Sequence, residues 1–115
     1  MAQIRQKPVA QKRGHAKKNP RYLAQVAKLP CCICEASGMA QTSHTQVHHP
    51  ICGRFEGRKA PDEAALPFCC DHHQGLRFDR DTSKLAIHRG KETWVAVHGE
   101  DTDYIEATQR KILGG

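Results

Sequence analysis

Apolar positions along the chain fall into short groups, each of which predicts one short secondary-structure element. Residues 1–18 show no apolar periodicity, and we expect this segment to be disordered. A helix is predicted next, with Asn19 as its N-cap and Pro20 in its first position, ending at Leu29-Pro30. Its apolar side is expected to consist of Tyr22, Leu23, Val26 and Ala27.

Two short strands are predicted in the middle of the chain. Residues 45–51 alternate weakly between polar and apolar positions, and the apolar run at residues 64–68 predicts a second strand. Residues 35–45 are expected to be a polar loop in which His44 is solvated. Residues 52–61 contain two glycines and several basic side chains, which predicts a mobile basic loop.

Helical segments are predicted for the last third of the chain. The first opens at His72-His73, and the second runs from residue 91 to 98 and is closed by Gly99. Asp103 and Glu106 have the spacing of a capping box, which predicts the start of a last helix. The side chains expected in the core are Trp94, Val95, Val97, Tyr104, Ile105, Ile112 and Leu113. For Trp94 and Tyr104 we favour a core position over a base-stacking role.

The formal net charge of +6 is unevenly distributed. Residues 1–34 hold eight Lys/Arg and no acid, whereas the rest of the chain has ten Lys/Arg against twelve Asp/Glu. A basic segment of this kind predicts a polyanionic partner, most simply nucleic acid, although a solubilising tail and a solvated loop remain the alternatives. The expected nucleic-acid contacts are Lys7, Lys12, Arg13, Lys17, Lys18, Arg54, Arg58 and Lys59.

The chain of 115 residues predicts one domain at residues 19–115, preceded by the basic arm at residues 1–18. Since only 38% of residues are hydrophobic, apolar burial alone would leave this domain marginally stable, and a structural metal would help. We find no signal peptide and no stretch of transmembrane length, so we expect a cytoplasmic protein with no membrane contact. We also expect the protein to be a monomer. In a reducing compartment, six cysteines favour metal binding over disulfides.

The spacing of the cysteines and of one histidine predicts a structural metal centre. Cys31 and Cys34 form a C-x-x-C half-site, Cys69 and His72 form a C-x-x-H half-site, and together they predict a tetrahedral structural zinc site. Cys32, Cys52 and Cys70 are predicted to be non-ligands that tolerate serine.

Four of the eight histidines stand in two adjacent pairs, His48-His49 and His72-His73. Adjacent residues of a strand face opposite sides, so each pair is expected to serve two different centres. His73 is then free to turn towards His48 or His49.

The order and spacing of four motifs resemble the HNH, or ββα-metal, nuclease family, and more narrowly the phage recombination-enhancement (Ref-like) RecA-dependent nucleases. The resemblance covers about residues 20–113. The motifs are Leu29-Pro30-Cys31-x-x-Cys34, Val47-His48-His49, Leu66-Pro67-Phe68-Cys69-x-x-His72-His73 and Ile87-His88-x-Gly90-Lys91-x-x-Trp94. It implies an α+β fold, namely a small zinc-stabilised ββα-metal (HNH-type) domain with flanking helices and a disordered basic N-terminal arm.

The resemblance also implies a function, DNA cleavage with a RecA filament in a bacterial host. His49 would be the general base, and His48, His73 and His88 would hold one catalytic divalent ion: Mg, Mn or Zn. An imidazole-rich site binds Zn²⁺ more readily than Mg²⁺, which prefers oxygen ligands. The sequence departs from the general pattern because it lacks the asparagine that orients the base histidine, and only Asp62 or Glu63 stands in that region.

Two other functions remain open from the sequence. The first is a zinc-stabilised adaptor that binds DNA or a RecA filament without cutting. The second is a zinc-ribbon-like structural protein whose additional histidines have no role. A histidine beside a metal ligand favours the nuclease over the adaptor, and a count of two ions per chain instead of one favours it over the structural protein.

Overall fold

The computed structural model of the protein describes residues 18–53, 59–75 and 81–114. The basic arm expected at residues 1–18 lies outside this part of the chain except for Lys18. Of the expected DNA contacts, Lys18 and Lys59 are described and both are exposed. Those that lie outside the described residues are Lys7, Lys12, Arg13, Lys17, Arg54 and Arg58.

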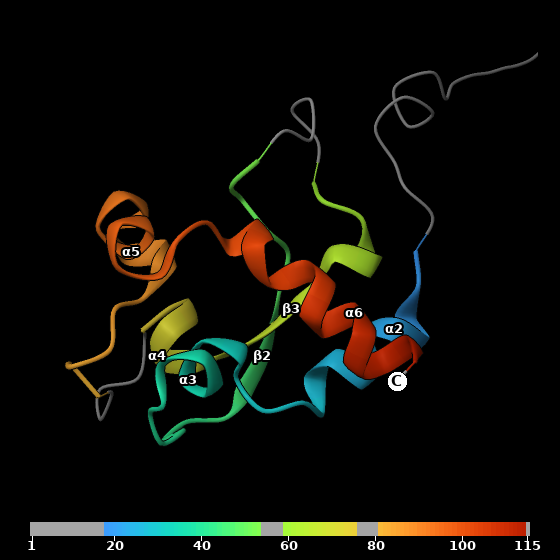
Figure 1. Cartoon of the computed structure of the whole chain (residues 1–115), viewed down its shortest axis with the longest axis horizontal. Coiled ribbons are helices and arrows are strands. Elements are labelled where there is room, and N and C mark those ends of the chain that lie inside the picture. Colours follow the sequence, from blue (N-terminus) through green and yellow to red (C-terminus); the bar gives the residue numbers. More distant parts are fainter. Residues whose placement is uncertain (1–17, 54–58, 76–80, 115) are drawn as a thin grey trace, which may run out of the picture.

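A two-stranded antiparallel sheet followed by a short helix stands at the centre of the molecule (Figure 1). Strand β2 (Thr45–His48) pairs with β3 (Leu66–Cys69), with Thr45 opposite Cys69. Helix α4 (Cys70–His73) begins directly after β3. The fold is therefore a small mixed α+β arrangement in which two strands lead into a helix, as the sequence predicts.

Strand β2 is shorter than predicted, since it ends at His48 and not at Ile51. The backbone N–H groups of Ile51 and Cys52 donate to the carboxylate of Asp101, at 2.8 and 3.1 Å. Because these donors are used by a side chain, they cannot extend the sheet ladder.

The boundaries of β3 and α4 also differ from the prediction. Residues Asp62–Ala64 form a 3₁₀ turn, η1, so the strand starts at Leu66 and not at Ala64. Helix α4 starts at Cys70, with Cys69 at its N-cap position, and not at His72. Consequently the two adjacent histidines lie in the last turn of α4 instead of opening it.

Helices α2 and α5 confirm the predictions from local sequence at their ends. Helix α2 (Pro20–Ala27) is capped by the Asn19 side chain, which accepts the N–H of Tyr22 at 3.1 Å. Helix α5 (Lys91–His98) ends at Gly99, whose φ of 80° suits a residue without a Cβ. On α2, Tyr22 and Val26 are buried, but Ala27 is exposed, contrary to the expected apolar side.

The polar loop predicted at residues 35–45 is partly wrong. A short helix, α3 (Cys32–Ser37), occupies its start, and Gly38 closes the helix with a left-handed φ of 69°. The sulfur of Cys31 accepts the N–H of Cys34 at 3.4 Å and thereby caps α3. A cysteine is not a usual capping residue, and so the sequence did not indicate this helix.

The start of the last helix also differs from the prediction. A 3₁₀ turn, η3 (Asp101–Tyr104), precedes α6 (Ile105–Leu113). The capping box pairs Glu100 with Asp103, and not Asp103 with Glu106, because the chain begins to coil one turn earlier. Another 3₁₀ turn, η2 (Ile87–Arg89), precedes the helix at residues 91–98 and carries His88.

Among the described residues, the core side chains form two groups. The larger group surrounds Phe68 and Trp94, and Tyr104 and Ile105 pack against its edge. Trp94 is fully buried, which confirms its predicted core position. The smaller group consists of Tyr22, Val26 and Ala65.

Two residues predicted in the core are exposed. Val97 is 62% exposed, because Trp94 and His98, whose rings lie 4.9 Å apart, take the inner side of α5. Leu113 is 70% exposed, since Ile112 is the residue of the last turn of α6 that packs against the smaller core group.

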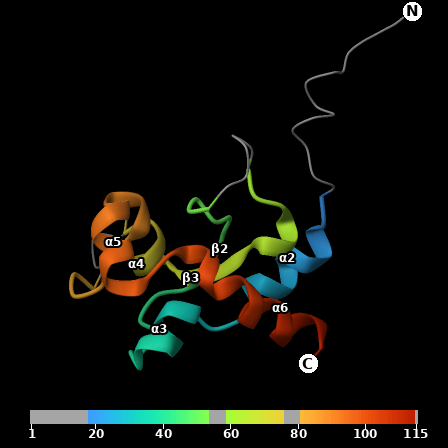
Figure 2. The ribbon, with the colours of Figure 1, turned by 45° about the horizontal axis from the view of Figure 1, so that its top comes forward.

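The helices flank the sheet on two sides. Figure 2 shows α2 and α6 side by side on one side and α4 and α5 side by side on the other. Among the described residues, none of the helices is long and apolar enough to span a bilayer.

Candidate metal centres

Four predicted zinc ligands meet in one buried cluster. Cys31 and Cys34 come from the start of α3, Cys69 is the last residue of β3, and His72 belongs to α4. The six cysteines of the chain are all free thiols, so none of the ligands is used in a disulfide. The cluster therefore joins one helix, the sheet and a second helix at a single point.

The distances in this Cys₃His cluster suit a tetrahedral zinc site. The Nδ1 atom of His72 lies 3.7, 3.5 and 3.3 Å from the sulfurs of Cys31, Cys34 and Cys69, and the last two sulfurs are 3.8 Å apart. With zinc bonds of about 2.3 Å to sulfur and about 2.0 Å to nitrogen, the edges of a tetrahedron measure about 3.5 to 3.8 Å. The four residues thus fit a metal such as zinc without rearrangement.

The electrostatics of the cluster favour a thiolate at Cys69. The hydrogen bond with Cys31, followed by the contact with His72, lowers the pKa of the Cys69 thiol to about 3. The same hydrogen bond, together with burial, raises the pKa of Cys31. Since the thiolate is the form that binds metal, Cys69 is prepared for coordination.

Three of the predicted catalytic histidines form a second cluster. His48 ends β2, His73 ends α4, and His88 lies in η2, and one nitrogen of each ring lies within 4.8 Å of the others. The ring centroids are 4.8 to 5.3 Å apart. His48 and His73 are buried, whereas His88 is exposed. The donor set therefore resembles a three-ligand metal site with one open side.

Hydrogen bonds fix the orientation of the two buried rings. The Nε2 atom of His48 lies 2.8 Å from an oxygen of the buried Asp101, and Nδ1 of His73 donates to the amide oxygen of Gln46 at 2.8 Å. These contacts leave Nδ1 of His48 and Nε2 of His73 for a metal. A carboxylate or amide behind a ligand histidine is the usual device for fixing its tautomer.

Two histidines of this cluster, His73 and His88, are favoured in the neutral form that binds metal. Burial, reinforced by the nearby His48 and His88, lowers the pKa of His73 to about 4. Burial and His48 also lower the pKa of His88. Burial raises the pKa of Asp101, but the hydrogen bonds with His48 and two backbone N–H groups outweigh this effect. The net pKa is lowered, so this side chain is an anion.

His49 points to a different partner from His48. Its Nε2 atom donates to the carboxylate of Asp62 at 2.9 Å, and both side chains are partly exposed, at 17% and 14%. Asp62 also accepts the backbone N–H of Asn19 at 2.7 Å, and this bond is the largest cause of its lowered pKa. Of the two acids available near His49, Asp62 is thus the one that orients the ring, while Glu63 accepts from the Asn19 amide.

The remaining cysteines and His44 lie outside both clusters. Cys32, Cys52 and Cys70 are buried and belong to neither of the two groups of metal-binding atoms found among the described residues. His44 is exposed, as predicted.

Three polar residues that contact the clusters were missed by sequence reasoning. Gln46 precedes His48 by two positions and so shares its side of the strand, which strand periodicity could have indicated. Asp101 contacts His48 across 53 residues, and Lys84 contacts Cys34 across 50 residues. No local pattern marks Asp101 or Lys84.

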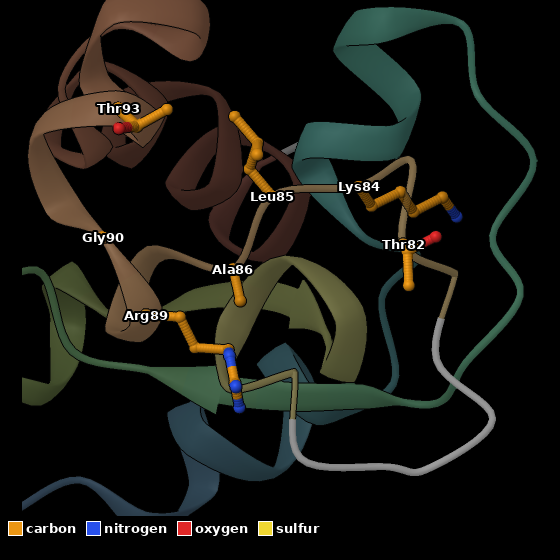
Figure 3. A pocket seen from close by; sticks show the side chains of 7 residues that line it. All are labelled: Thr82, Lys84, Leu85, Ala86, Arg89, Gly90 and Thr93. Atoms are coloured by element: carbon orange, nitrogen blue, oxygen red, sulfur yellow. The ribbon is translucent and has the colours of Figure 1, made fainter.

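A surface pocket of about 220 Å³ lies beside η2, between the Lys84 segment and the start of α5 (Figure 3). Thr82, Leu85, Ala86 and Thr93 contribute to its wall. Arg89, also at the pocket, donates to the carbonyl of Gly75 at 3.3 Å.

The protein matches no family model, and no curated protein or solved structure shows significant similarity to it.

Asp101 is expected to control metal binding by the three-histidine cluster. We expect Asp101→Asn to weaken divalent metal binding there by about 10- to 100-fold, because the buried acceptor of His48 loses its charge. Competition with a chromophoric chelator measures this affinity, and the Cys₃His site should retain its zinc. Glu106→Gln, which changes an exposed acid on α6, is the control. If the three-histidine cluster of Asp101→Asn bound divalent metal with unchanged affinity, Asp101 would have no role in that site.

Proposed function

We propose that this protein is a metal-dependent endonuclease of the HNH (ββα-metal) type that hydrolyses phosphodiester bonds in DNA. The observation that supports this most strongly is the pair of adjacent histidines with separate partners. His48 belongs to the three-histidine cluster, whereas His49, held by Asp62, belongs to neither cluster. A purely structural zinc protein does not need the His49–Asp62 pair beside a metal-binding histidine.

In this proposal His49 is the general base. Because its Nε2–H is donated to Asp62, the lone pair of Nδ1 is free to take a proton from water. The water oxygen then forms a bond to phosphorus and the bond to the leaving oxygen breaks. Asp62 stabilises the imidazolium that results, since its low pKa keeps it ionised throughout.

His48, His73 and His88 would hold the catalytic ion of the proposed enzyme. A divalent ion supplies charge stabilisation for the phosphorane and for the leaving oxygen. The exposed position of His88 leaves this cluster accessible from solvent, which a phosphate oxygen requires. The buried Asp101 and the partly buried Gln46 keep the other two rings in place before substrate arrives.

The further parts of the proposal are cooperation with a RecA filament in phage or prophage recombination, and action as a monomer in the cytoplasm of a bacterial host. They rest on the motif order described above. Cleavage of supercoiled plasmid and of single-stranded DNA, in Mg²⁺, Mn²⁺ and Zn²⁺ and with or without a RecA filament, tests them together. Absence of cleavage in every combination by a protein with both metal sites filled would leave the adaptor as the better function.

The basic arm is expected to supply DNA affinity but no chemistry. Deleting residues 1–18 removes six Lys/Arg, so DNA binding should weaken and its dependence on salt should become less steep. Fluorescence anisotropy at several salt concentrations measures both. Deleting residues 1–4, which contain no charged side chain, is the control. If the longer deletion left the salt slope unchanged, the arm would be a solubility tail.

A further inference from the structure

Lys84 is a buried lysine whose ammonium lies against the Cys₃His cluster. The residue is 2% exposed, and its Nζ atom lies 3.5 Å from the sulfur of Cys34. It also donates to the carbonyl of Ala40 and to the hydroxyl of Thr42. In Figure 3 the side chain extends away from Arg89 towards α3, the helix that carries Cys34.

A buried lysine needs a negative partner, because desolvation of an ammonium ion is costly. The Cys₃His donor set provides one. Three thiolates and a neutral imidazole around a divalent ion carry a net charge of −1. A second anion is close, since the hydroxyl of Thr42 donates to Asp71 at 3.2 Å. The hydroxyl of Thr42 stands between Lys84 and Asp71, whereas the Cys34 sulfur contacts the ammonium directly.

We infer that Lys84 is the charge-balancing residue of the Cys₃His centre: its ammonium donates to the Cys34 thiolate and stabilises the metal-bound, negatively charged form of the cluster. A charge-assisted N–H···S contact withdraws electron density from the sulfur. It should therefore raise metal affinity while making the bound thiolate less electron-rich. This inference concerns the structural centre and does not depend on nuclease activity.

Three substitutions separate this role from simple packing. Lys84→Met removes the charge and keeps an unbranched stem of similar length beside the pocket. Lys84→Gln also removes the charge but keeps an N–H donor for Ala40 and Thr42, and Lys84→Arg keeps the charge. Thr42→Val is the matched control, because it breaks the Lys84–Thr42–Asp71 chain without touching the contact with Cys34.

Zinc affinity, measured by chelator competition on the full chain, is expected to fall about 10- to 100-fold in Lys84→Met and Lys84→Gln. Lys84→Arg and Thr42→Val should stay within about threefold of the original protein. Replacing zinc by Co²⁺ gives a second measurement, the absorption spectrum of the cobalt site, which a change in packing alone does not shift. Loss of the ammonium should shift the sulfur-to-cobalt charge-transfer band to lower energy in both neutral variants and not in Lys84→Arg.

The inference is overturned by any of three results. The first is a zinc affinity and a Co²⁺ spectrum of Lys84→Gln that equal those of the original protein. The second is a loss of affinity in Thr42→Val as large as that in Lys84→Met, which would make Asp71 the true partner. The third is a Lys84→Gln protein that stays unfolded in saturating zinc, because a residue acting through metal affinity can be offset by excess metal.

Discussion

Replacing Cys69 by serine is expected to unfold the domain. Cys69 is fully buried where β3 meets α4, and its sulfur lies next to Cys34 and His72, so the site would lose the ligand that joins the sheet to both helices. Structural zinc contributes about 10–16 kcal/mol of apparent binding free energy in small zinc domains. That is as large as the whole stability of a typical domain, about 5–15 kcal/mol. Cys31→Ser should have the same effect for the same reason.

Circular dichroism during thermal unfolding, together with zinc analysis, measures this result. Cys70→Ser is the matched control, because Cys70 is the next residue and is also buried but lies outside the cluster. It should keep its zinc and a cooperative transition. Removal of zinc from the unaltered protein by a chelator should also abolish the transition. A Cys69→Ser protein with unchanged zinc content and melting temperature would exclude Cys69 as a ligand.

Replacing His49 by alanine is expected to reduce DNA cleavage by about 10²- to 10⁴-fold, which is the usual contribution of a general base. The ring of His49 contacts Asp62 and is partly exposed, so its loss should leave the core and both metal clusters intact. DNA affinity and metal content should therefore stay unchanged. His48→Ala and His73→Ala should instead lose the catalytic ion and keep the structural zinc.

Cleavage rates and metal content measured on the same preparations distinguish these three variants. His44→Ala is the control, since His44 is an exposed histidine on the segment before β2 and belongs to neither cluster. It should cut DNA at the original rate. Unchanged cutting by a metal-replete His49→Ala protein would eliminate His49 as the base and favour the adaptor function.

Local sequence predicted the features that depend on neighbouring residues. The C-x-x-C and C-x-x-H spacings identified both halves of the Cys₃His cluster. Two ligands three positions apart in a turn can bind the same metal ion. Asn19-Pro20 and Gly99 marked the start of α2 and the end of α5 through their own backbone preferences. The alternation around His48 and His49 correctly indicated that the two rings have different partners.

Only the tertiary structure shows which residues that are far apart in the chain contact one another. Asp101 and Lys84 look like ordinary surface residues in the sequence, yet each is buried against a metal-binding side chain at least 50 residues away. Asp101 also ends β2 early, because its carboxylate accepts two backbone N–H groups after the strand. The alternation of polar and apolar residues does not predict this end. Trp94 and His98 take the inner side of α5, which leaves Val97 in solvent despite its apolar side chain. In each case contacts between distant parts of the chain decide the position of the residue. A periodic pattern indicates only which side of an element is apolar and not which residues pack against that side.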